Sequence, residues 1–104
     1  DAPVVSFDAM ENIYFAVTRK NISGQPQEGW IPSEKISVDE AVKLFTKNAA
    51  YASYTEDENG TIEVGKNADF VVLEKNIYEI DPDEIKTTKV DMTILGGETV
   101  FERK

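Results

Sequence analysis

Few side chains of this sequence could do chemistry. Its 104 residues include neither His nor Cys. This excludes Ser-His-Asp catalysis, thiolate nucleophiles, disulfide bonds and the nitrogen and sulfur ligands of zinc. Catalysis by this chain alone would have to use carboxylates, Lys, Tyr or hydroxyl groups. One carboxylate stands out by position, because Asp1 precedes Ala-Pro-Val-Val, a stretch typical of the exit of a strand. Asp1 is therefore either an arbitrary end or a carboxylate that had a function in a larger protein.

The charge of the chain limits its partners. There are 20 Asp and Glu residues against 11 Lys and Arg residues, which gives a net charge of −9. Such a field repels phosphate groups, so we expect no nucleic-acid partner and no anionic membrane surface. No apolar run approaches the ~20 residues of a transmembrane span, and no secretory signal pattern is present. We therefore expect a cytoplasmic protein with one modest core, whose acidity serves solubility.

A first helix should follow the opening strand exit. Asp8 and Glu11 have the spacing of a capping box, and the helix is expected to end near Lys20. Residues 21–35 are rich in Gly and Pro and predict a loop. The apolar face of this helix is formed by Met10, Ile13, Tyr14 and Val17.

A second helix is predicted over residues 38–54. Ser37 and Glu40 form its capping box, in which each side chain accepts a hydrogen bond from the backbone N–H of the other residue. Its Ala-rich face suggests close approach to another element. That face consists of Val38, Ala41, Val42, Phe45, Ala49 and Ala52.

Beyond residue 54 the apolar period changes from 3.6 to 2, which predicts strands. Ile62 and Val64 should face inward, and Asp81-Pro82 should begin a short helical turn. Gly96-Gly97 can supply the positive φ angles of a hairpin turn. The expected strands are residues 60–64, residues 69–74 and the two arms of residues 89–103. With no βαβ pattern, the sequence predicts an α+β arrangement.

Single motifs identify no chemistry. Residues 55–66 resemble part of an EF-hand loop, but Lys66 stands where a bidentate Glu is required, so no calcium site is predicted. Gly65-Lys66 lacks the frame of a phosphate-binding loop, and Asp69 is expected to accept backbone N–H bonds beside it. Trp30 either stacks on a ligand or covers the edge of the core.

Taken together, the motifs resemble a known family. The order "SVDEAVKLFTKNAAYASY", "GTIEVGKNADFVVLE" and "ILGGETVFE" is similar to the C-terminal end of the amidohydrolase superfamily of metal-dependent hydrolases. The first third, from "DAPVV" through "ENIYFAVTR" to "GW", resembles more narrowly the third amidohydrolase subfamily. The resemblance covers nearly the whole chain.

The resemblance implies a fold and a role for Asp1. Members of that family have a (β/α)8 barrel with one or two divalent metals, commonly zinc, and a small β-sandwich built from strands on both sides of the barrel in sequence. Asp1 matches the aspartate that ends the last barrel strand, binds metal and takes a proton from the attacking water. The other metal ligands of the family would lie upstream. Tyr14, Arg19 or Trp30 could touch substrate in the parent protein.

The sequence is therefore predicted to be an α+β fragment. Residues 1–54 would be the barrel remnant (last-strand exit, helix, loop and final helix), and residues 55–104 the C-terminal strands of the β-sandwich with the Gly-Gly hairpin. A complete barrel is excluded because it needs roughly 250 residues. The parent would hydrolyse amide or other C–N bonds of a small-molecule substrate. The fragment alone is expected to hold no metal, to be inactive and to self-associate. The alternative is a free-standing acidic α+β module that binds a protein partner.

Overall fold

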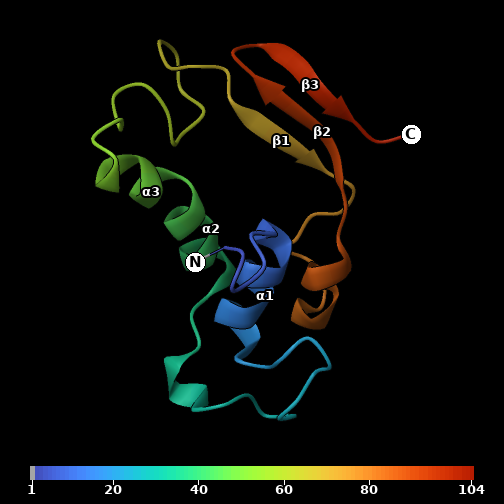
Figure 1. The fold of residues 1–104 in the computed structure, drawn as a ribbon. Coiled ribbons are helices and arrows are strands. Elements are labelled where there is room, and N and C mark those ends of the chain that lie inside the picture. The colour runs from blue at the N-terminus through green and yellow to red at the C-terminus, as the bar shows by residue number, and fades with distance from the viewer. Residues whose placement is uncertain (1) are drawn as a thin grey trace. The chain divides into compact units, whose positions relative to one another are not determined.

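The computed structural model describes residues 2–104 and has the expected α+β composition (Figure 1). Asp1 lies outside the described residues. The chain forms two compact units, one made of residues up to Val42 with Asn76–Thr88, the other of Lys43–Lys75 with Lys89–Lys104. No helix within residues 2–104 is long and apolar enough to cross a membrane. The elements are α1 (Ala9–Thr18), η1 (Pro32–Glu34), α2 (Val38–Phe45), α3 (Lys47–Ala52), β1 (Phe70–Leu73), η2 (Pro82–Thr87), β2 (Val90–Leu95) and β3 (Glu98–Glu102).

The first unit is built on the packing of α1 against η2, which lie side by side in Figure 1. Tyr14 is fully buried there, its hydroxyl donates to the carbonyl of Asn21 at 2.9 Å, and the ammonium of Lys86 lies 4.7 Å from its ring centroid. As predicted, Asp81 caps η2 and Pro82 is its first residue. The buried side chains of this unit are Met10, Ile13, Tyr14, Thr18, Ala41, Ile77, Ile85 and Thr88.

The start of α1 differs from the predicted capping box in one respect. Asp8 is the N-cap, and its carboxylate accepts from the backbone N–H groups of Met10 and Glu11. The backbone N–H of Asp8 donates to the hydroxyl of Ser6 rather than to Glu11. The cap is therefore made by Asp8 alone, and the reciprocal half of the box is replaced by Ser6.

The prediction of one continuous helix over residues 38–54 is wrong. The capping box of Ser37 and Glu40 is present, with bonds of 2.9 and 3.1 Å in the two directions. The helix nevertheless divides into α2 and α3 at Thr46, whose φ of −124° and ψ of −96° are not helical. The predicted apolar face is buried only in part, because Phe45 and Ala49 are exposed. The helical spacing of apolar residues in the sequence continues across Thr46, although the backbone at Thr46 is not helical.

The second unit contains an antiparallel sheet in the order β1-β2-β3 (Figure 1). Gly96 and Gly97, with φ of 59° and 83°, form the predicted hairpin turn. Asp69 accepts a hydrogen bond from the backbone N–H of Gly96 at 2.8 Å, which ties this turn to the start of β1. At the other end, Arg103 binds the carboxylates of Asp91 and Glu74, and hydrogen bonding to Asp91 raises the pKa of Arg103 above its ordinary value.

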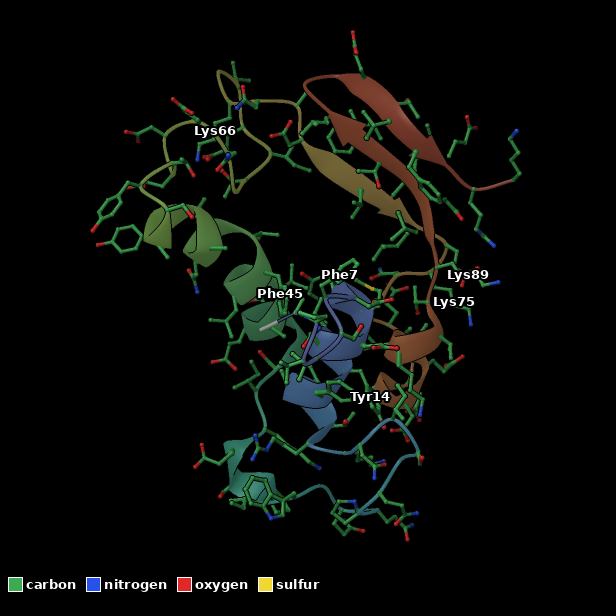
Figure 2. All side chains as sticks on the ribbon, viewed as in Figure 1. Phe7, Tyr14, Phe45, Lys66, Lys75 and Lys89 are labelled. Carbon is green, nitrogen blue, oxygen red and sulfur yellow. The ribbon has the colours of Figure 1, made fainter. Side chains whose placement is uncertain are left out.

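The prediction of a strand at residues 60–64 is also wrong. This segment is a loop. Ile62 and Val64 were both expected to face inward, but Ile62 is 82% exposed and Val64 is exposed even more fully. Lys66, labelled in Figure 2, fixes the loop by donating to the carbonyl of Glu56 at 2.6 Å and to the hydroxyl of Thr61 at 2.8 Å. Alternation alone does not make a strand here, because no strand within residues 2–104 pairs with this segment.

Candidate functional site

The residues that the sequence singled out lie in different environments. Asp1 falls outside the described residues, so its predicted role as metal ligand and proton acceptor stays a prediction. Tyr14 is buried in the core and is not available to a substrate. Within residues 2–104 no group of three or more His, Cys, Asp or Glu side chains could hold a metal ion.

Arg19 and Trp30 are brought together across the loop that separates them in sequence. The guanidinium of Arg19 lies 5.1 Å from the ring centroid of Trp30. The backbone N–H of Trp30 donates to the carbonyl of Arg19 at 2.8 Å, and Nε of Arg19 donates to the carbonyl of Trp30 at 3.0 Å. The indole remains 64% exposed, so Trp30 does not cover the core, and the interpretation of Trp30 as a core-edge residue is wrong.

The backbone on both sides of the contact between Arg19 and Trp30 has unusual conformations. Arg19 ends α1 in the left-handed region with φ of 60°, a position where Gly is the usual residue. Gly29 has φ of 84°, and a Cβ atom there would lie 2.3 Å from the carbonyl oxygen of Thr18. Ile31 is also left-handed, with φ of 50°. The chain therefore approaches the end of α1 so closely that only a residue without a side chain fits beside Thr18.

An open groove of about 390 Å³ runs beside this pair. One of its lining residues is Lys20, whose ammonium makes an ion pair with Asp83 at 2.9 Å. The hydrogen bond to Asp83 raises the pKa of Lys20 above its ordinary value, which already lies well above neutral pH. The groove is lined by Phe15, Arg19, Lys20, Asn21, Gln25, Pro26 and Trp30.

Sequence reasoning named Arg19 and Trp30 separately but did not predict that they form one site. It missed Phe15, in the second half of α1, and Lys20, two residues beyond the end of that helix. The signal for Lys20 was the pair of adjacent cations at the end of a helix. Trp30 lies close to Arg19 because the backbone is left-handed at Arg19 and Gly29. The spacing of apolar residues in the sequence does not predict such backbone conformations.

Comparison with known proteins gives a consistent family. A family model named Amidohydro_3, described as the Amidohydrolase family, matches residues 1–101. The chain is 35% identical over 103 residues to YtcJ of Bacillus subtilis (strain 168), covering 99% of this chain and 20% of that protein. It is 33% identical over 103 residues to the N-substituted formamide deformylase of Arthrobacter pascens, covering 99% of this chain and 18% of that protein.

A solved structure agrees with these relatives. The amidohydrolase from Thermotoga maritima MSB8 matches 99% of this chain and 22% of its own, with a TM-score of 0.65 and 25% sequence identity. A shorter match, 43% identical over 63 residues, is to the imidazolonepropionase of Bacteroides thetaiotaomicron and covers 61% of this chain and 15% of that enzyme. The chain thus spans about a fifth of the length of the relatives that it matches nearly end to end.

Proposed function

Because this chain belongs to the Amidohydrolase family, we propose that it is the C-terminal part of a metal-dependent amidohydrolase. The parent would use a metal-activated water to hydrolyse amide or other C–N bonds of a small molecule. The observation that carries the proposal is that 99% of the chain aligns with only about a fifth of its relatives, one of them a deformylase of N-substituted formamides. An enzyme of that length would have room for the barrel that this chain lacks.

The divalent metal of such a parent, which we propose to be zinc, needs ligands from outside this chain. No cluster within residues 2–104 suits a metal, and neither His nor Cys occurs in the sequence. The described residues thus do not make a metal centre by themselves, so no catalytic step is derived from them. We propose Asp1 as the one metal ligand and proton acceptor that this chain would contribute.

The same proposal assigns the two parts of the chain to two domains of the parent protein. Residues 1–54 would come from the barrel and residues 55–104 from the β-sandwich. Neither part brings a complete site, so we expect the chain alone to be inactive. Its cytoplasmic location stays a prediction.

The test begins with the coding sequence upstream of Asp1. An open reading frame that encodes a barrel with a His-x-His pair near its start is expected. The longer protein should then be purified, its metal content measured, and its hydrolysis of N-benzylformamide followed by release of formate. Asp1→Asn should lower kcat/KM at least about a hundredfold, since it removes a metal ligand and a proton acceptor.

Asp57→Asn is the matched control, because it makes the same change at an exposed loop carboxylate. It should leave metal content and kcat/KM unchanged. A stop codon or an unrelated domain upstream would favour the free-standing acidic module instead. Stoichiometric metal and turnover in the 104-residue chain itself would contradict the proposed need for upstream ligands.

A further inference from the structure

The groove beside Arg19 and Trp30 has the features of a ligand site that the amidohydrolase proposal does not use. Its volume of about 390 Å³ is large enough for a small molecule, and the groove is open to solvent. It combines a cation, an exposed indole and the ring of Phe15. Its lining therefore mixes polar and charged side chains with flat apolar ones, so it could contact both a polar and an apolar part of one ligand.

Arg19 has more donor groups than its contacts with Trp30 use. The guanidinium carbon of Arg19 lies over the ring of Trp30, 5.1 Å from its centroid, and the five N–H donors of a guanidinium lie in its own plane. Nε is used by the carbonyl of Trp30. Within the part of the chain that the structure describes, the two Nη groups of Arg19 have no hydrogen-bond partner. Two parallel N–H groups in one plane match the two oxygens of a carboxylate.

The backbone around the groove holds this arrangement at a cost. Arg19 and Ile31 both adopt left-handed conformations that residues with side chains disfavour. Left-handed non-glycine residues gather at ligand sites, where the surrounding structure holds them in place. At this helix end, where Gly is usual, the left-handed residue is Arg19, which lines the groove.

Local charge favours an anion even though the chain is acidic. Arg19 and Lys20 both line the groove, and among the lining residues none is acidic. Asp83 neutralises Lys20 in part through their ion pair, so Arg19 is the principal cation. An anion that also carries a flat apolar group would gain from the exposed indole.

We propose that this groove binds a small carboxylate attached to a flat apolar group. The Nη groups of Arg19 receive the carboxylate, and Trp30 and Phe15 contact the apolar part. Because the site lies wholly within the first compact unit and holds no metal ligand, the proposal does not depend on the proposed hydrolase chemistry.

Trp30 is the only tryptophan of the chain, so its fluorescence reports directly on the groove. The full chain should be titrated with sodium benzoate at constant ionic strength, with benzamide and benzylamine as the neutral and cationic analogues. Benzoate should give a saturable change, with a Kd on the order of 1 mM. Both analogues should bind at least about tenfold more weakly, because they lose the charge-assisted bonds to Arg19.

Three variants test whether benzoate binds at Arg19 or is attracted by any positive charge on the chain. Arg19→Gln should weaken benzoate binding at least about tenfold, and Arg19→Lys should restore only part of it, since Lys lacks the planar pair of donors. Lys89→Gln, which removes the same charge at an exposed residue that does not line the groove, should bind like the unmodified chain.

Amide chemical shifts of the unmodified chain keep the test independent of whether Arg19→Gln folds. Benzoate should shift residues 15, 19–21, 25 and 30. The proposal is overturned if benzoate fails to saturate, if benzamide binds equally well, or if the shifts fall elsewhere. Each of these outcomes leaves the amidohydrolase proposal unaffected, since that proposal is tested on metal and turnover in the longer protein.

Discussion

Gly29 is a residue whose side chain the local geometry cannot accept. Its φ of 84° is unfavourable for any residue with a Cβ atom, and its neighbour Thr18 presents a carbonyl oxygen 2.3 Å from where that atom would stand. Gly24, in the same loop, has a similar φ of 82°, but nothing lies within 4 Å of its Cβ position. A Cβ atom at Gly24 would therefore meet only the unfavourable backbone conformation, whereas a Cβ atom at Gly29 would also clash with Thr18.

We predict that Gly29→Ala destabilises the chain by about 2–4 kcal/mol, because it adds a backbone clash to the conformational penalty. Gly24→Ala should cost only about 1 kcal/mol. Urea unfolding followed by circular dichroism measures both. Equal losses of unfolding free energy for the two variants would contradict the close approach of Gly29 to Thr18.

Ion pairing also acts at the scale of single residues. The hydroxyl of Thr61 and then the ammonium of Lys66 hydrogen-bond the carboxylate of Glu63, and together they lower the pKa of Glu63 below its ordinary value. A lowered pKa in the folded state stabilises the loop above the unfolded pKa, and this contribution is lost as the pH falls through the folded pKa. The loop that replaces the expected strand is thus held by polar contacts rather than by apolar burial.

At the scale of elements, the two longer helices begin in different ways. α1 has a one-sided cap, in which Asp8 accepts two backbone bonds and Ser6 takes the place of the reciprocal partner. α2 has the full capping box of Ser37 and Glu40. α2 is only eight residues long, and a helix this short depends strongly on its cap.

We predict that Ser37→Ala destabilises the chain by about 1 kcal/mol, because a backbone N–H of the first turn of α2 loses its acceptor. Ser33→Ala is the matched control, since Ser33 is exposed in η1 and is not the N-cap of that helix. It should change the unfolding free energy by less than about 0.5 kcal/mol. Comparable losses for both variants would show that the cap of α2 contributes nothing specific.

For the chain as a whole, the unusual feature is the amount of apolar surface left exposed. In the sheet, β1 and β3 are both edge strands, and each exposes apolar side chains. A register shift beside Ile94 leaves Val100 as an extra residue of β3, which weakens but does not remove this edge. The exposed apolar residues of the two strands are Phe70, Val71, Val72, Val100 and Phe101.

We predict that the isolated chain self-associates through the edge of β3. Antiparallel pairing of two copies with the register centred on Val100 would place Glu98 opposite Glu102, so association should strengthen as salt screens these charges. Sedimentation velocity at 0.05 and 0.5 M NaCl (about 14 and 4 Å of screening length) measures this. A monomer at high protein concentration under both conditions would refute the prediction.

Two variants locate the contact. Val100→Glu adds a charge to the exposed edge strand and should shift the distribution toward monomer. Ile62→Glu adds the same charge to a still more exposed residue of a loop, and should leave association unchanged. An equal effect of both variants would indicate general charge repulsion rather than strand pairing.

The sequence by itself determined the features that depend on neighbouring residues. The caps at Asp8, Ser37 and Asp81, the glycine turn at 96–97 and the core face of α1 follow from local hydrogen bonding and from the 3.6-residue period. The combined order of three sequence segments, residues 37–54, 60–74 and 94–102, also identified the family. The match of the family model over residues 1–101 confirms that identification.

Tertiary structure alone decided where the periodic patterns stop and which distant residues meet. The helical pattern ran on through Thr46, and the alternating pattern of residues 60–64 lacked a partner strand, so both predictions failed. The pairing of Arg19 with Trp30 required left-handed backbone at Arg19 and Gly29. These outcomes depend on contacts between residues far apart in sequence, and a local pattern carries no information about such contacts.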